Sequence, residues 1–172
     1  MKKIILLGCI LVLASCDINI NSTTPHIIPI TIYTNPIHSA VQKIGLDERT
    51  DRQELTEFLE IDPARTEWCA AFVNSVLEES GIISNKDHKY PLTARAFLDW
   101  GNKVNKEDVQ PGDIVIFPRG NQGWQGHVGF YISTIELDGI EYYNILGGNQ
   151  DDQVSIDRYR SSTVLGIRRN SF

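Results

Sequence analysis

The chain has 172 residues, of which 41% are hydrophobic, and its formal net charge is −6 at neutral pH. This length suits one domain with a single hydrophobic core. An acidic chain without a basic run is a poor nucleic-acid binder, so no nucleic-acid partner is expected. The four histidines are scattered, and the sequence has neither a paired-cysteine spacing nor a glycine-rich phosphate loop. Neither a metal ion nor a cofactor is therefore expected.

The first residues have the pattern of an export signal. Met1-Lys2-Lys3 supplies positive charge, and an apolar run from Ile4 to Ala14 follows it. The run is well short of the ~20 apolar residues that a membrane-spanning helix needs, so residues 1–15 are expected to be a signal peptide. The ending Leu13-Ala14-Ser15-Cys16 resembles the lipobox of bacterial lipoproteins. The alternative is an ordinary secretory signal that carries a chance cysteine.

The lipobox resemblance implies that Cys16 becomes the lipidated first residue. The acyl chains would hold the protein on the membrane. The next residue, Asp17, resembles the signal that retains lipoproteins at the cytoplasmic membrane, so we expect attachment to the outer face of that membrane. Residues 16–35 hold Pro25 and Pro29 and are expected to form a tether, because proline favours an extended chain.

Helices are expected in the first part of the folded domain, which we place at residues 36–172. Asn35 followed by Pro36 is typical of a helix start, and Thr50 with Gln53 has the spacing of a capping box. A third pattern places apolar side chains on one helical face. Its members are Cys69, Phe72, Val73, Val76 and Leu77. The expected helices cover residues 35–45, 50–63, 66–81 and 93–100.

After Gly101 the hydrophobic period changes to two, which indicates β-strands. Asp138-Gly139 is typical of a two-residue hairpin turn. Helices followed by antiparallel strands predict an α+β fold, in which the N-terminal helices pack on one face of an antiparallel sheet. The expected strands cover residues 113–117, 127–133, 140–146, 154–156 and 164–168.

Cys69 is the thiol that remains if the leader is removed and Cys16 is lipidated. It lies in the first turn of the expected third helix, where unpaired N–H groups and the helix dipole favour an anion. A helix N-terminus lowers the pKa of a thiol, and the thiolate is the nucleophile. Cys69 is therefore a candidate nucleophile, and the alternative is a structural cysteine buried in the core.

The expected hairpin supplies a partner for Cys69. With a two-residue turn, His127 lies opposite Gln150 and Val128 opposite Asn149, within a slip of one or two residues. A cysteine and a histidine that an amide orients form the arrangement of thiol hydrolases. A strand histidine and an asparagine after two glycines also occur as plain structural residues. The spacing alone leaves both interpretations open.

Four blocks of sequence occur in order between residues 40 and 169. They are Trp68-Cys69-Ala70-Ala71-Phe72-Val73-Asn74, Pro111-Gly112-Asp113-Ile114-Val115-Ile116-Phe117, Gly126-His127-Val128-Gly129-Phe130-Tyr131 and Leu146-Gly147-Gly148-Asn149-Gln150. Together they resemble the motifs of the CHAP family, the cysteine, histidine-dependent amidohydrolases/peptidases. The resemblance implies a papain-like fold shared with NlpC-type peptidases, with Cys69 as nucleophile and His127 as base. It also implies peptidoglycan as substrate, cut at the glycan–peptide amide, in the stem peptide or in the cross-bridge.

The third catalytic residue is the position where the sequence departs from the family. Many CHAP enzymes end in a Glu-x-Asn motif, and here Gly147 replaces the glutamate while Asn149 matches the asparagine. The resemblance therefore implies Asn149 as the third catalytic residue, with Gln150 as the other candidate. Gln150 and Trp124, which lies in the loop before His127, are the expected substrate-binding residues.

Three functions are consistent with these features. The first is a membrane-anchored peptidoglycan hydrolase that acts through a thioester on Cys69. The second is a catalytically degenerate lipoprotein that binds wall peptides or a partner protein, which the missing glutamate favours. The third is a phage or toxin lysis hydrolase, which neighbouring genes would distinguish.

Overall fold

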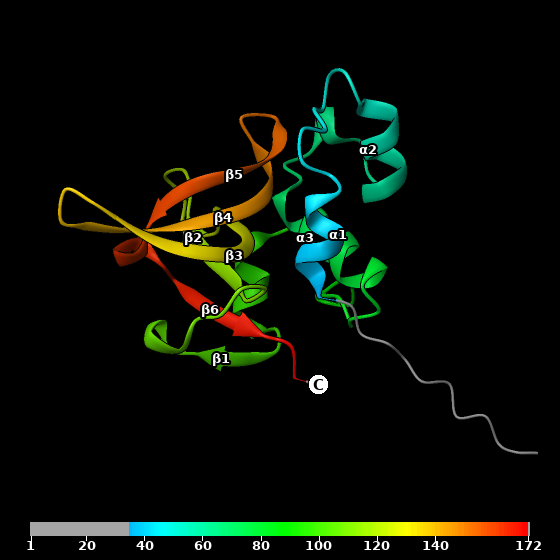
Figure 1. Ribbon diagram of the computed structural model, residues 1–172. Helices are drawn as coiled ribbons and strands as arrows, with labels where there is room; N and C mark the ends of the chain where they lie inside the picture. The colour runs from blue at the N-terminus through cyan, green and yellow to red at the C-terminus, as the bar shows by residue number, and fades with distance from the viewer. Residues whose placement is uncertain (1–34, 172) are drawn as a thin grey trace, which may run out of the picture. The chain divides into compact units, whose positions relative to one another are not determined.

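The computed structural model describes residues 35–171 (Figure 1). The expected signal peptide (1–15) and all of the expected tether (16–35) except Asn35 lie outside the described residues. Within 35–171, no helix is long and apolar enough to cross a membrane. The described helices are α1 (Pro36–Val41), α2 (Arg52–Leu59), α3 (Cys69–Glu79) and the short 3-10 helices η1 (Pro63–Arg65), η2 (Ala94–Asp99), η3 (Lys106–Asp108) and η4 (Ser161–Thr163).

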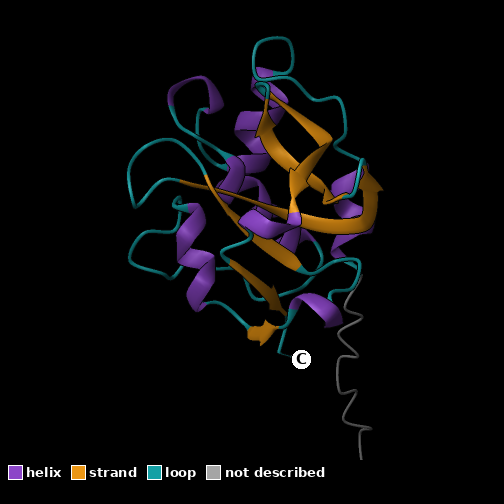
Figure 2. Ribbon diagram, turned by 90° about the vertical axis from the view of Figure 1, so that its left-hand side faces the viewer, coloured by secondary structure: helices purple, strands orange, loops and turns teal. Residues whose placement is uncertain are grey.

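One antiparallel sheet follows the helices, and this confirms the predicted α+β fold. The strands are β1 (Asn102–Val104), β2 (Ile114–Pro118), β3 (Gly126–Leu137), β4 (Ile140–Gln150), β5 (Gln153–Arg160) and β6 (Gly166–Arg169). Their order in the sheet is β1-β6-β2-β3-β4-β5. Helices α1, α2 and α3 gather beside the sheet in Figure 1, and the turned view shows the long strands crossing in front of the helical layer (Figure 2).

The helix starts agree only in part with the sequence signals. Asn35 caps α1 as predicted, because its Oδ1 accepts a hydrogen bond from the Ile37 N–H at 3.0 Å. The predicted capping box is wrong: α2 begins after Asp51, and the Gln53 side chain donates to Glu57 instead. The helix expected to start near residue 66 begins at Cys69, which makes that residue the first of α3.

The hairpin between β3 and β4 has the predicted turn. Asp138 and Gly139 have φ values of 53° and 73°, the positive values that a tight hairpin turn requires. The predicted pairing holds from Leu137 opposite Ile140 to Ser133 opposite Asn144. The register then shifts between residues 131 and 133, and β4 pairs irregularly with β5 between residues 147 and 150. These two irregularities decide which side chains meet at the open end of the hairpin.

Helix α3 joins the helical layer to the sheet. Nine of its residues are buried, including Phe72 and Leu77, and burying a side chain of that size contributes about 1.5–3 kcal/mol. Gly148 permits this packing, since a Cβ there would lie 2.3 Å from Cζ3 of the buried Trp68. A second apolar cluster, formed by Val115, Phe117, Tyr131, Tyr143, Ile145 and Ile167, is built from sheet residues alone.

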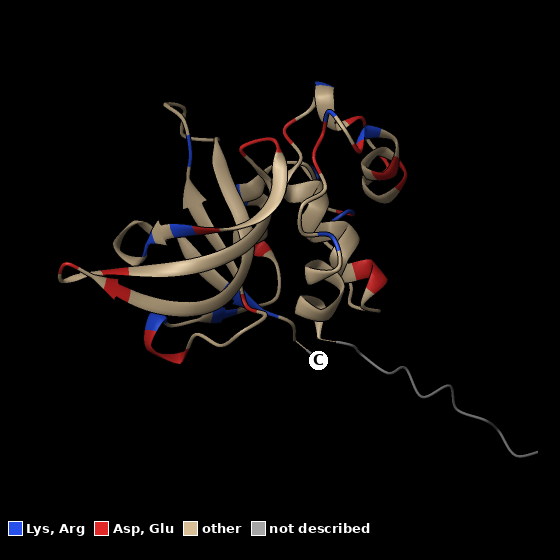
Figure 3. Ribbon diagram, turned by 45° about the horizontal axis from the view of Figure 1, so that its top comes forward, with Lys and Arg blue, Asp and Glu red and all other residues tan. Residues whose placement is uncertain are grey.

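Charged residues of both signs are spread along the chain of the domain. Figure 3 shows Asp and Glu on the helices and near the β3–β4 turn, with Lys and Arg between them. The Asp113 carboxylate is buried and accepts two hydrogen bonds from Arg169, at 2.7 and 2.8 Å. This ion pair joins the start of β2 to the end of β6 and so closes that side of the sheet.

Candidate active site

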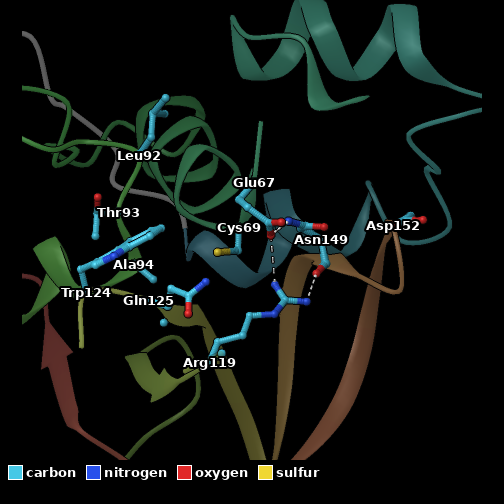
Figure 4. A pocket seen from close by; sticks show the side chains of 12 residues that line it. Glu67, Cys69, Leu92, Thr93, Ala94, Arg119, Trp124, Gln125, Asn149 and Asp152 are labelled. Atoms are coloured by element: carbon cyan, nitrogen blue, oxygen red, sulfur yellow. Dashed lines mark hydrogen bonds and ion pairs between the residues drawn. The ribbon is translucent and has the colours of Figure 1, made fainter. Parts of the chain in front are cut away.

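A cleft of about 300 Å³ opens above the start of α3 (Figure 4). Residues from the segment before α3, from the start of η2, from the loop after β2 and from the end of β4 line it. They are Glu67, Cys69, Leu92, Thr93, Ala94, Arg119, Gly120, Trp124, Gln125, Gly126, Asn149 and Asp152. Cys69 is the nucleophilic side chain in this set, so the cleft brings a substrate-sized space to the predicted thiol.

The Cys69 thiol is buried at the N-terminus of α3, with 3% of the residue exposed. Burial raises the pKa of the thiol, although the Arg119 charge and the backbone N–H groups of Val128 and Ala70 act in the opposite direction. The expected lowering of this pKa is therefore not what the site shows at rest, because desolvation outweighs the helix N-terminus. The backbone N–H of Val128, the residue that follows His127, is among the groups that favour the thiolate of Cys69.

His127 lies in β3, opposite Phe117 of β2, and only 1% of it is exposed. Burial, together with the nearby Arg119 charge, lowers the pKa of its imidazole to about 4. Its Nε2 is 3.0 Å from Oε1 of Gln150, and its Nδ1 has no hydrogen-bond partner. At neutral pH the ring is therefore uncharged, with one nitrogen paired and the other available.

The amide of Gln150 decides which nitrogen of His127 carries the proton. Its Nε2 donates to the backbone carbonyl of Ser155 at 2.8 Å and to the Ser155 hydroxyl at 3.0 Å. A carbonyl oxygen can only accept, so this end of the amide must be the NH₂ group and Oε1 must face the ring. Oε1 is also only an acceptor, so Nε2 of His127 holds the proton. Nδ1 is then the basic nitrogen.

Asn149 lies apart from the orienting position that the sequence predicted for it. Its Nδ2 donates to Oε2 of Glu67 at 2.7 Å, and its backbone carbonyl accepts from Arg119 at 3.0 Å. It makes no hydrogen bond to His127. Asn149 has a φ of 56°, and this left-handed residue within the β4 irregularity places the next side chain, Gln150, against the ring.

The structure gives no support to the expected substrate-binding role of Gln150, which stays a prediction. Only 2% of this residue is exposed, and it does not line the cleft. The same irregularity that directs its amide toward His127 keeps it beneath the surface of the sheet. Trp124, by contrast, lines the cleft as expected and is 66% exposed. Trp68 lies in the core, where its Nε1 donates to Glu48 at 3.0 Å.

Gly147, which stands where the family motif has a glutamate, faces the same ring. A Cβ at this position would lie 3.2 Å from Nε2 of His127 and 3.1 Å from Oε1 of Gln150. A side chain at position 147 would thus point at the nitrogen that Gln150 now contacts. Glycine at position 147 leaves the space beside Nε2 of His127 to the Gln150 amide.

Arg119 and Glu67 are cleft residues that the sequence reasoning did not identify. Arg119 Nη1 lies 3.7 Å from Oε2 of Glu67, and Figure 4 shows this pair joined to Asn149 in the cleft that also holds Cys69. The spacing offered a signal for each: Glu67 is two residues before the cysteine, and Arg119 directly follows the strand that pairs with His127. Among residues 35–171, no cluster of His, Cys, Asp and Glu side chains could hold a metal ion.

The chain is similar in sequence to a known protein family. The CHAP domain family matches residues 61–149, just over half of the chain. The chain belongs to the CHAP family. The match contains Cys69 and His127, so it confirms the family that the four sequence blocks predicted. Because the family match begins at residue 61, it does not cover the first residues of the chain, and the signal peptide and the lipidation of Cys16 stay predictions.

One curated relative is a probable endopeptidase p60 of Listeria seeligeri, 32% identical over 84 residues. The matched region is 46% of this chain but 14% of that protein, so the chain spans a small part of the relative's length. Among solved structures, an NlpC/P60 family protein from Bacillus cereus ATCC 10987 aligns with 79% of this chain and 39% of its own. The sequence identity is 19% and the TM-score 0.48.

Proposed function

We propose that this CHAP protein is a peptidoglycan hydrolase that cleaves an amide bond of the wall peptide through a thioester on Cys69. The observation that carries the proposal is the state of His127. Its Nε2 is bound to Gln150, whereas its basic Nδ1 has no hydrogen-bond partner. His127 directly precedes Val128, whose backbone N–H favours the Cys69 thiolate. A nucleophile, a base and an orienting amide are the parts of a thiol hydrolase.

The pKa directions indicate a neutral resting pair. Burial raises the pKa of the Cys69 thiol and lowers that of His127 to about 4, so neither group is charged near pH 7. The reaction then begins with a proton transfer from the thiol to Nδ1, which accompanies attack of the sulfur on the substrate carbonyl. In this transfer His127 acts as the base, as the family resemblance implies, and the products are the Cys69 thiolate and the protonated imidazole.

Nδ1 of His127 carries one proton in each half of the reaction. The sulfur forms a bond to the carbonyl carbon while Nδ1 takes the thiol proton, and the N–H groups at the start of α3 face the developing oxyanion. The C–N bond then breaks, Nδ1 returns the proton to the leaving amine, and a thioester remains on Cys69. Water attacks the thioester, Nδ1 accepts its proton, and the C–S bond breaks as the thiol is restored.

Gln150 is the orienting residue of this proposal, in place of Asn149. Its amide fills the position beside Nε2 toward which a side chain on Gly147 would point. The departure from Glu-x-Asn, which favoured a degenerate binding protein, is thus matched by a replacement at the same nitrogen. This supports the catalytic function over the degenerate one.

The products of digestion test the proposed function. Purified peptidoglycan is incubated with the full-length protein, and the soluble products are analysed by mass spectrometry. We expect new amine and carboxylate ends, and the fragment masses separate cleavage at the glycan–peptide amide from cleavage within the peptide. Cys69→Ala and His127→Ala should each abolish release, and the double variant should lose no more. Wild-type release by Cys69→Ala would exclude the mechanism.

Two amide variants form a matched pair in the same assay. Gln150→Ala removes the acceptor from His127, so it should reduce turnover strongly. Asn149→Ala removes a hydrogen bond to Glu67 and should reduce turnover less. The reverse order would return the orienting role to Asn149.

We also propose that the protein acts from the membrane surface. The support lies in the sequence, where a short charged leader ends in Leu13-Ala14-Ser15-Cys16. Lipid on Cys16 would attach the protein to the outer face of the cytoplasmic membrane, from which residues 16–35 would extend the catalytic domain toward the wall.

A further inference from the structure

Tyr159 of β5 contacts both groups of the proposed orienting pair. Its ring lies nearly parallel to the His127 imidazole, with centroids 5.1 Å apart and an interplanar angle of 12°. The Tyr159 ring also stacks on Phe117, with centroids 4.6 Å apart. Its hydroxyl lies 3.1 Å from Oε1 of Gln150. Tyr159 does not line the cleft, so it acts on the site from behind.

The hydrogen bonds around Gln150 fix the direction in which the Tyr159 hydroxyl donates. Because Nε2 of the amide binds the Ser155 carbonyl, Oε1 receives protons from both His127 and Tyr159. A flipped amide would place an oxygen against the Ser155 carbonyl and a donor against the protonated Nε2 of His127. Burial raises the pKa of Tyr159, so its hydroxyl keeps its proton at every pH at which the enzyme would work.

We propose that Tyr159 is a positioning residue for the hydrolase, which holds the imidazole plane with its ring and the Gln150 amide with its hydroxyl. The proposal rests on the proposed function. Its consequence is that the neutral His127 ring stays in the Nε2–H tautomer, with the basic Nδ1 available to Cys69. Loss of the hydroxyl should weaken the preference for this tautomer, because the amide loses one of the hydrogen bonds that hold its Oε1 toward the ring.

Tyr159→Phe in the full-length protein tests the hydroxyl alone, because the ring and its stacking remain. We expect kcat on soluble peptidoglycan fragments to fall about fivefold, the value of one net hydrogen bond, with KM unchanged. A loss of kcat without a change in KM marks an effect on the reacting groups rather than on substrate binding. Tyr143→Phe is the matched control. Tyr143 lies opposite Tyr159 in the β4–β5 pair, its ring packs on Tyr131, and its hydroxyl makes no hydrogen bond to Gln150 or His127.

A second readout needs no substrate. Nitrogen-15 NMR of the imidazole, assigned with His127→Gln, distinguishes the two neutral tautomers. We expect the Nε2–H form in the wild type and in Tyr143→Phe, and a mixture in Tyr159→Phe. Ser155→Ala, which removes one acceptor from the amide, should shift the tautomers in the same direction.

Each outcome is decisive for one of the two proposals. A Tyr159→Phe protein with wild-type kcat and a wild-type tautomer spectrum overturns the positioning role. A rise in KM at constant kcat would do the same, because it would make Tyr159 a substrate-binding or purely structural residue. If the wild type releases no products, the proposed function fails, and the tautomer spectra still decide whether Tyr159 positions His127.

Discussion

Acid should destabilise this protein through His127, because the folded state holds the ring without a charge. An unfolded histidine has a pKa near 6.5, whereas burial lowers that of His127 to about 4. Between these values the unfolded chain binds a proton that the folded chain does not. The free energy of unfolding therefore falls as the pH decreases through this window, and the full stabilisation is present above pH 6.5.

The size of the effect follows from the two pKa values. A shift from 6.5 to about 4 corresponds to about 3 kcal/mol when complete. Between pH 7 and pH 5, the part that is lost amounts to about 2 kcal/mol. The ring is almost fully buried, so solvent screening reduces this value little.

Urea unfolding followed by tryptophan fluorescence measures this loss. Wild type and His127→Gln are compared at pH 7 and pH 5, and the other titrating groups cancel in the difference between the two proteins. The wild type should lose about 2 kcal/mol more than the variant. Equal losses in both proteins would show that His127 titrates at its ordinary pKa, and the neutral resting pair would be refuted.

Three further changes have defined outcomes. Arg119→Gln should raise the pKa of the Cys69 thiol, because the guanidinium favours the thiolate. The pH dependence of Cys69 modification by iodoacetamide measures this pKa, and an unchanged pH dependence would exclude this role. Gly148→Ala should lower the free energy of unfolding by about 1–3 kcal/mol, because its Cβ would meet Trp68; Gly123→Ala, which meets no atom within 4 Å, is the control. Cys16→Ser should move the protein from the detergent to the aqueous phase of Triton X-114; a wild-type protein in the aqueous phase would contradict lipidation.

Local signals predicted much of the fold. The Asn35 cap, the apolar face of α3 and the Asp138-Gly139 turn each lie within a few residues of the structure that they determine. The short strand β1 was missed because it has one partly buried residue, Val104, and takes its place by pairing with β6. The helix expected over 93–100 is the 3-10 helix η2, which apolar spacing alone does not distinguish.

The candidate site was predicted less completely, for a reason that the strands make clear. Cys69 and His127 carry local motifs, so the sequence proposes both as catalytic candidates. The choice between Asn149 and Gln150 depended on two register shifts, and an irregularity of one residue changes the side chain that faces His127. Tyr159 reaches the ring only through the pairing of β5 with β4, and no motif marks it.

The central claim is that Cys69 carries the acyl group between two half-reactions. The direct measurement is the intact mass of the protein after it is mixed with soluble peptidoglycan fragments and quenched in acid within the first turnover. We predict an added mass equal to the acyl part of the substrate, located on the Cys69 peptide and removed by hydroxylamine, and no addition in Cys69→Ser. Product release by the wild type with no adduct on Cys69 at any quench time, or an adduct on another residue, would contradict the account.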